Sequence, residues 1–222
     1  MNKSLLLDYD ILHQELTTNP SLIPVVVKEV NRFEAEYQKA ETVLDGYVQQ
    51  SISLRGSESL RGALQCMISN SGPPTRRQRI MQRVREYFEE EEYDPTPALQ
   101  MACATVKRIA SQLQTHQDLI RDQKDKLEAM HQDYIGFQRT LSQLKMYPEL
   151  LRKARLMQEL IAMQVQSFTV VNLVFADNQH VIDELDAALT LIQPVVHNYK
   201  QSKLLHADHR KLISMHQWLK KK

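Results

Sequence analysis

The hydrophobic pattern of the chain is most regular between Leu99 and Leu144. Residues recur there at alternating steps of three and four, with charged and amide residues in the positions between them. The series contains Leu99, Ala102, Val106, Ile109, Leu113, His116, Ile120, Gln123, Leu127, Met130, Tyr134, Phe137, Leu141 and Leu144. Twelve of these fourteen residues are apolar. A repeat of this kind predicts one very long helix that buries a narrow seam against other helices.

A second very long helix is predicted behind Pro148, which ends the first one. The run Phe168–Phe175 is rich in β-branched residues, but the helical phase continues on both sides of it. We therefore expect a helix that is buried there on more than one face. Pro194 predicts a kink, because proline removes a backbone hydrogen bond. The seam of this helix contains Ala154, Met157, Ile161, Gln164, Phe168, Val171, Phe175, Asn178, Ile182, Leu185, Leu189, Ile192, Val196 and Tyr199.

A third long helix and several shorter segments complete the pattern. The third helix is predicted to begin at Pro24, because proline suits the first turn of a helix, and it has the same steps of three and four. Its seam contains Val26, Val30, Phe33, Tyr37, Ala40, Leu44 and Tyr47. The other predicted segments are a helix over 4–17, a helix over 59–69, a charged helix over 75–92 and a helical tail from Lys203.

These elements predict an all-α fold, an elongated antiparallel coiled-coil helical bundle with two very long helices plus shorter helices. The five glycines in 222 residues agree, because sheet-rich and α/β proteins use glycine in turns and phosphate loops. We expect one elongated helical domain, 1–222. Within it, the long bundle helices occupy 24–55 and 97–200, a short-helix insertion occupies 57–93, and a C-terminal helical tail occupies 203–222.

The two longest seams also predict their own pairing. If the chain reverses at Tyr147 and Pro148, facing residues have numbers that sum to about 294 or 295. This places His116 opposite Asn178, where we expect the two side chains to form a hydrogen bond. A lone polar layer in an apolar seam fixes the register of a coiled coil at some loss of stability.

The composition of the chain indicates its cellular environment and the classes of partner that it can bind. The formal net charge of +1 gives no global field that would attract nucleic acid or a membrane. Cys66 and Cys103 lack the spacing of a disulfide framework or a zinc site, which indicates a reduced, cytoplasmic protein. The most apolar run, Phe168–Phe175, is far shorter than the roughly 20 residues that span a bilayer, so we expect no transmembrane segment.

Chemical motifs are sparse. Glu128 and His131 have the Glu-x-x-His spacing of di-iron bundles, but such a site needs the motif twice and the chain has it once. His206 and His209 lie three residues apart near Asp208, and two ligands alone bind a metal weakly. The chain has no nucleophile elbow and no glycine-rich phosphate loop. We therefore expect no metal, no cofactor and no enzymatic activity.

The predicted function is binding, as a coiled-coil adaptor or a structural subunit of a larger complex. Its expected partners are other proteins with helical surfaces, and the same seams can also pair between copies of the chain as a homo-oligomer. One alternative is a nucleic-acid-associated protein that uses the basic helix Arg76–Arg85. The other is a membrane-surface helical bundle. The candidate partner-binding residues are Arg76, Arg77, Arg79 and Arg83. The alternative is a helix exposed to solvent, in which Arg83 and Arg85 form ion pairs with the glutamates that follow them.

Overall fold

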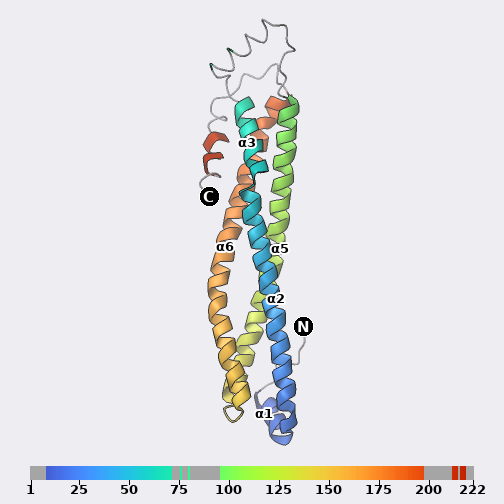
Figure 1. The fold of residues 1–222 in the computed structure, drawn as a ribbon, viewed down its shortest axis with the longest axis vertical. Coiled ribbons are helices and arrows are strands. Elements are labelled where there is room, and N and C mark those ends of the chain that lie inside the picture. The colour runs from blue at the N-terminus through green and yellow to red at the C-terminus, as the bar shows by residue number, and fades with distance from the viewer. Residues whose placement is uncertain are drawn as a thin grey trace. The chain divides into compact units, whose positions relative to one another are not determined.

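A computed structural model describes residues 9–71, 76, 80, 96–197, 212–214 and 216–218. Within these residues the chain is an all-α bundle of helices that pack against one another, as predicted (Figure 1). The elongated shape and the antiparallel order of the two longest helices stay predictions. The elements are α1 (Tyr9–Thr18), the 3₁₀ helix η2 (Pro20–Leu22), α2 (Ile23–Arg55), α3 (Glu58–Ser71), α5 (Thr96–Gln143) and α6 (Pro148–His197).

Local chemistry explains where these helices begin and end. Gly56 and Ser57 separate α2 from α3, and the Ser57 hydroxyl accepts a hydrogen bond from the backbone N–H of Leu60 at 3.3 Å. This serine is therefore the N-cap of α3. Pro97 lies in the first turn of α5. Backbone N–H groups in the first turn form no hydrogen bond within the helix, so a proline without an N–H costs nothing there. α6 continues through Pro194 to His197.

The chain divides into two compact units. The first unit comprises residues 1–49 and 118–175, and the second comprises residues 50–117 and 176–222. The three long helices α2, α5 and α6 each contribute residues to both units. The expectation of a single domain over 1–222 stays a prediction.

The core of the first unit is built from one face each of α1, α2, α5 and α6. The predicted apolar seam residues of α5 from Ile120 to Leu141 lie in this core or pack against it, and the polar exception Gln123 donates a hydrogen bond to the carbonyl oxygen of Ala40 at 2.9 Å. Two leucines of α1 cover the core, as expected for the short N-terminal helix. The buried members of this core include Leu12, Leu16, Val30, Tyr37, Leu44, Ile120, Leu127, Tyr134, Leu141, Ala154, Met157 and Val171.

The core of the second unit is covered differently. Here α3 packs with α5 and α6, and Leu212 of the C-terminal segment is buried in the same cluster. No residue of the two long seams is exposed among those whose burial is described, which confirms the seam prediction in both units. The buried members of this core include Leu60, Leu64, Met67, Leu99, Val106, Ile109, Leu113, Val181, Leu185, Ala188, Ile192 and Val195.

One prediction about α6 is wrong. The run Phe168–Phe175 was expected to be buried on more than one face, but only Val171 and Val174 of this run are buried. Val170 and Leu173 are exposed large hydrophobic residues. The first core takes in Val171 and Val174, with Phe168 and Phe175 packed partly against it, while the described residues leave Val170 and Leu173 exposed.

Candidate interaction surface on α6

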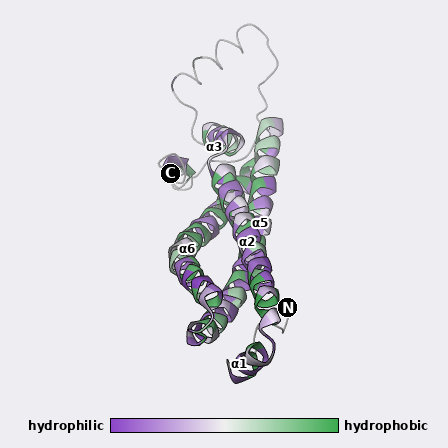
Figure 2. Cartoon of the chain, turned by 60° about the horizontal axis from the view of Figure 1, so that its bottom comes forward, coloured by the Kyte–Doolittle hydropathy of each residue, from purple (hydrophilic) through white to green (hydrophobic). Residues whose placement is uncertain are grey.

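The middle of α6 has no charged side chain. From Leu160 to Ala176 the sequence contains no Asp, Glu, Lys or Arg, and Glu159 and Asp177 flank this stretch. Within the described part of the chain, α6 is the one helix long and apolar enough to cross a membrane by length and composition (Figure 2 shows its hydropathy). Only 19% of its most apolar window is buried. A helix in the middle of a protein core would be mostly buried, so this stretch is unusually apolar for its exposure.

Four large apolar side chains define what we call the α6 surface: Leu156, Met163, Val170 and Leu173. Met163 is 59% exposed and Leu173 is 64% exposed. Leu156, Met163 and Val170 are spaced by seven residues, so they form a stripe along one side of the helix. Gln164 and Val171, each one position after a residue of this stripe, are buried and lie about 100° further around the helix. The exposed apolar residues are therefore additional to the seam that builds the core.

A groove runs between α5 and α6 within the first unit. It has a volume of about 710 Å³, and we call it the α5–α6 groove. It contains two carboxylates, Asp125 and Glu128, but no lysine or arginine. Glu128 pairs with Lys124, which lies outside the groove, at 3.3 Å. The lining residues are Asp125, Glu128, Ala129, His131 and Gln132 from α5 and Phe168, Thr169 and Asn172 from α6.

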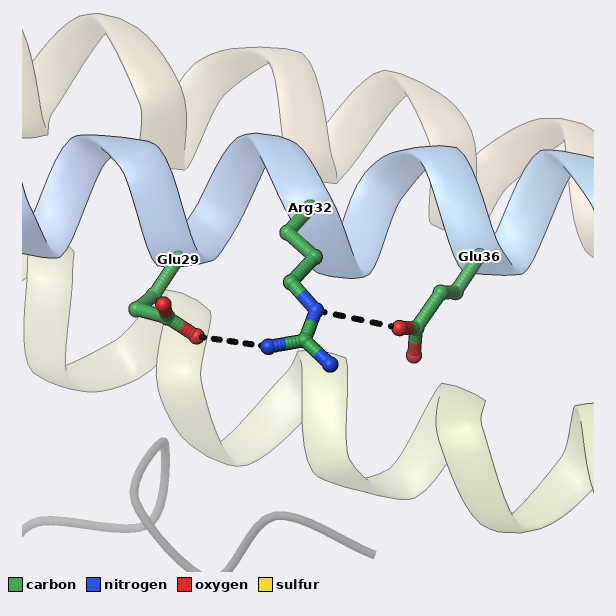
Figure 3. Close-up of polar contacts among 3 residues, drawn as sticks. All are labelled: Glu29, Arg32 and Glu36. Carbon is green, nitrogen blue, oxygen red and sulfur yellow. Dashed lines mark hydrogen bonds and ion pairs between the residues drawn. The ribbon is translucent and has the colours of Figure 1, made fainter.

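A second groove in the same unit, between α2 and α5, has a different electrostatic character. Its lining includes acidic and basic side chains, and its volume is about 630 Å³. Arg32 bridges two of the acids, with Nη1 at 4.0 Å from Glu29 and Nε at 3.3 Å from Glu36 (Figure 3). The charges along this groove therefore compensate one another, whereas the lining of the α5–α6 groove is acidic.

Glu128 and His131, the residues with di-iron spacing, both line the α5–α6 groove. Glu128 is exposed and His131 is half-buried, so they flank the core as the sequence indicated. Among the described residues, no group of three or more His, Cys, Asp and Glu side chains is arranged to hold a metal ion. His206 and His209 lie outside the described residues.

The polar layer expected in the second unit differs from the prediction. Asn178 is 0% exposed, but neither its Nδ2 nor its Oδ1 has a hydrogen-bond partner among the described residues, so the expected His116–Asn178 hydrogen bond is not formed. The bond between α5 and α6 lies one residue further along each helix, where Gln117 Nε2 donates to Gln179 Oε1 at 2.9 Å. The register role of His116 and Asn178 stays a prediction. The sequence could hardly have predicted the Gln117–Gln179 hydrogen bond, because both glutamines lie one position outside the seams.

A buried polar cluster, absent from the sequence predictions, joins α2, α5 and α6 in the first unit. Lys153 Nζ lies 3.1 Å from Glu34 Oε2, with side-chain exposures of only 11% and 16%. The ring of Tyr134 packs against Phe33 at 4.6 Å and against Tyr37 at 5.0 Å between centroids. Burial raises the pKa of Tyr134, and the Glu34 carboxylate adds to this effect. Burial likewise raises the pKa of Tyr37, helped by Glu41.

The two cysteines behave as small partly buried residues of the second core. Cys66 and Cys103 are free and pack against that core. Burial raises the pKa of the Cys103 thiol, against the opposing effect of Lys107. The neutral thiol is therefore favoured, whereas nucleophilic cysteines depend on a lowered pKa.

The arginine-rich segment is only partly described. Arg76 is exposed, and so is Ile80. Arg77, Arg79 and Arg83 lie outside the described residues.

No protein-family model matches the chain, and comparisons with the curated proteins and with the solved structures found no match.

Proposed function

We propose that this chain is a non-enzymatic protein–protein interaction protein, a coiled-coil adaptor or structural subunit that binds other proteins through the α6 surface. The proposal rests on one observation: α6 leaves a charge-free stretch largely exposed, with Met163, Val170 and Leu173 at its outer side. Contiguous exposed apolar residues mark interaction sites in soluble proteins, and charged residues are depleted at the centres of interfaces.

The energetics favour a partner on this surface. Burial of apolar area contributes about 25 cal/mol per Å², and full burial of one Leu, Val or Met side chain contributes about 1.5–3 kcal/mol. Three or four such side chains are enough for the centre of an interface, where a few residues carry most of the affinity. Stripes spaced by seven residues suit a helix as the partner, since a helix presents its own side chains at the same spacing.

Affinity purification from the native cell tests the proposal. The double variant M163E/L173E places charges on the α6 surface and should lose the proteins that the wild-type chain retains. M101E is the matched control, because Met101 is also an exposed methionine on a long helix and is 74% exposed. If all three forms retain the same proteins, the α6 surface is not the binding site.

A membrane-surface role is the second candidate, because α6 is long and apolar enough to cross a membrane. Flotation with vesicles containing anionic lipid distinguishes the two roles. Under our proposal the wild-type chain stays with the soluble fraction. Flotation of the wild-type chain that M163E/L173E abolishes would favour the membrane role instead.

A further inference from the structure

We propose that the α6 surface binds a helix of a partner protein in the way that the chain's own C-terminal segment packs on α6 in the second unit. The partner is another protein, whose helix has an apolar seam without charges and an aromatic side chain that packs against Leu173. This inference rests on the proposed function, since it names the chemistry of the partner at the same surface.

The exposed residues of the α6 surface have counterparts further along the same helix. Residues seven positions apart lie on nearly the same side of a helix, with a drift of about 20° per heptad. Two series with this spacing run along α6, which is one continuous helix. The first series contains Leu156, Met163, Val170, Asp177, Glu184 and Leu191, and the second contains Leu173, His180 and Ala187.

In the second unit, the C-terminal segment packs at these positions. Its residues 212–214 and 216–218 are helical, and Leu212 is buried in the second core. The rings of Trp218 and His180 lie 4.5 Å apart in an edge-to-face arrangement. The segment and α6 line a common cavity of about 350 Å³, to which the two series contribute His180, Glu184, Ala187 and Leu191. The chain itself therefore covers this side of α6 with a helical segment that carries large apolar side chains.

The corresponding positions of the first unit have no such cover among the described residues. Val170 is 54% exposed, whereas Glu184, two heptads later in the same series, is half-buried. Leu173 is 64% exposed and corresponds to His180, the residue whose ring Trp218 contacts. A partner helix on the α6 surface would therefore repeat, at exposed positions, an arrangement that the chain already forms.

The difference in polarity between the two sets of positions defines the chemistry of the partner. In the second unit the positions include the polar side chains of His180 and Glu184, but residues 160–176 of α6 have no Asp, Glu, Lys or Arg. A charged side chain in the partner seam would be buried there without a counter-charge. An aromatic side chain over Leu173 would take the place that Trp218 has over His180, and aromatic residues are enriched among the side chains that carry most of the affinity of an interface.

A second copy of the chain and a lipid bilayer are the other occupants to consider. Each copy keeps its C-terminal segment joined to α6 through residues 198–211, and such a tethered segment has an effective concentration in the millimolar range at its own site. The segment therefore stays on its own second unit. A bilayer covers apolar side chains whatever their spacing, whereas the heptad spacing on α6 is the one that another helix matches.

A synthetic peptide with the sequence of residues 208–222 tests the inference on the full-length chain, whose own segment already occupies the second unit. Fluorescence anisotropy measures its binding, and a scrambled peptide of the same composition is the control. We expect the native peptide to bind, and Trp218→Ala in the peptide to weaken binding about tenfold. The chain variant M163E/L173E should also weaken binding at least about tenfold, whereas M101E should not change it.

A further variant identifies the unit that the peptide occupies. A187E places a charge at the second-unit position that corresponds to Leu173, and it should not weaken binding if the peptide lies on the α6 surface. Binding that A187E abolishes and M163E/L173E retains would show that the peptide displaces the chain's own segment, and would overturn the inference. Circular dichroism of each variant checks that it folds.

The outcomes separate this inference from the proposed function. Equal binding of the native, scrambled and Trp218→Ala peptides to the wild-type chain would overturn the inference without any use of chain variants. The proposed function would still stand if M163E/L173E lost proteins in the affinity purification. Sedimentation velocity tests the second copy: a dimer of the wild-type chain that M163E/L173E abolishes would make a second copy the occupant and would overturn the inference.

Discussion

The two units treat the same helix differently. In the second unit, the apolar residues of α6 are covered by several segments, and Val181, Leu185, Ala188 and Ile192 are all buried. Trp218 of the C-terminal segment lies with its ring 4.5 Å from that of His180. In the first unit, α6 buries one face and leaves Met163 and Leu173 exposed. Among the described residues, the apolar surface of α6 is covered in the second unit and exposed in the first.

The units also differ in how polar groups bridge their helices. The first unit contains a buried ion pair and two buried tyrosines, whereas the second contains the partly exposed ion pair Arg55–Asp177 at 3.1 Å and the glutamine pair Gln117–Gln179 beside the buried amide of Asn178. Buried charges and amides depend on their partners, because an unpaired polar group loses its hydration without compensation. Substitutions at these positions therefore probe what holds each unit together.

Within the first unit, the largest expected effect is at the buried ion pair. Lys153→Ala leaves the Glu34 carboxylate buried without its cation and should lower the free energy of unfolding by about 3–5 kcal/mol in urea titrations followed by circular dichroism. The double variant Glu34→Leu/Lys153→Met removes both charges and should recover most of that loss.

Arg32→Ala is the matched control for this prediction. Arg32 is 59% exposed and its ion pairs with Glu29 and Glu36 are on the surface (Figure 3), so its loss should change the free energy of unfolding by less than about 1 kcal/mol. An effect of Lys153→Ala as small as that of Arg32→Ala would show that the Glu34–Lys153 pair is not buried.

The second prediction concerns Asn178 in the second unit. Because both of its amide atoms lack hydrogen-bond partners, Asn178→Leu should raise the free energy of unfolding by about 1–3 kcal/mol. The hydrogen bond to His116 that the sequence predicts would give the opposite sign. A loss of stability in Asn178→Leu that the double variant with His116→Leu restores would favour that earlier interpretation.

The third prediction follows from the raised pKa values of Tyr37 and Tyr134 in the first unit. A tyrosine whose pKa is higher in the folded state contributes its full stability below the unfolded pKa of about 10, and this contribution is lost as the pH rises further. Stability should therefore fall above about pH 10, by up to about 1.4 kcal/mol per pH unit for each group.

The variant Tyr37→Phe/Tyr134→Phe should make this alkaline dependence shallower. Absorbance titration of the phenolate should show two of the eight tyrosines ionising only on unfolding. Eight tyrosines that titrate together in the folded chain would contradict the burial of these two rings.

The smallest expected effect is on the α6 surface itself. Leu173→Glu in the first unit should change the free energy of unfolding by no more than about 0.5 kcal/mol, because its side chain is already in water. Leu185→Glu in the second unit places a charge in a buried position and should prevent normal folding. A large loss of stability in Leu173→Glu would mean that the chain covers this residue.

Local sequence patterns predicted the helices and their seams well. Ile120, Leu127 and Leu141 were expected in the core and are buried, because the three-and-four repeat is a property of one helix and needs no knowledge of its partners. The Glu34–Lys153 pair could not be predicted in this way. Its members are 119 residues apart, and their contact depends on how α2 and α6 pack.

The candidate site depends on whether other segments pack over the apolar side chains of α6, and a periodic pattern carries no information about this. The sequence of Phe168–Phe175 is the same in both cases, and its apolar character alone predicts a buried helix. Similarly, the seams predict a contact between His116 and Asn178, which lies one residue along each helix from the observed contact between Gln117 and Gln179. A small rotation of each helix decides which neighbour meets its partner.

Site-specific photo-crosslinking in the native cell tests most directly whether the α6 surface binds another protein. A photoreactive amino acid replaces Leu173 in one form of the chain and Met101 in another, and both positions are exposed. We predict a covalent adduct with a protein of defined mass from position 173 and none of that mass from position 101. Adducts only with lipid, or the same adducts from both positions, would contradict the account.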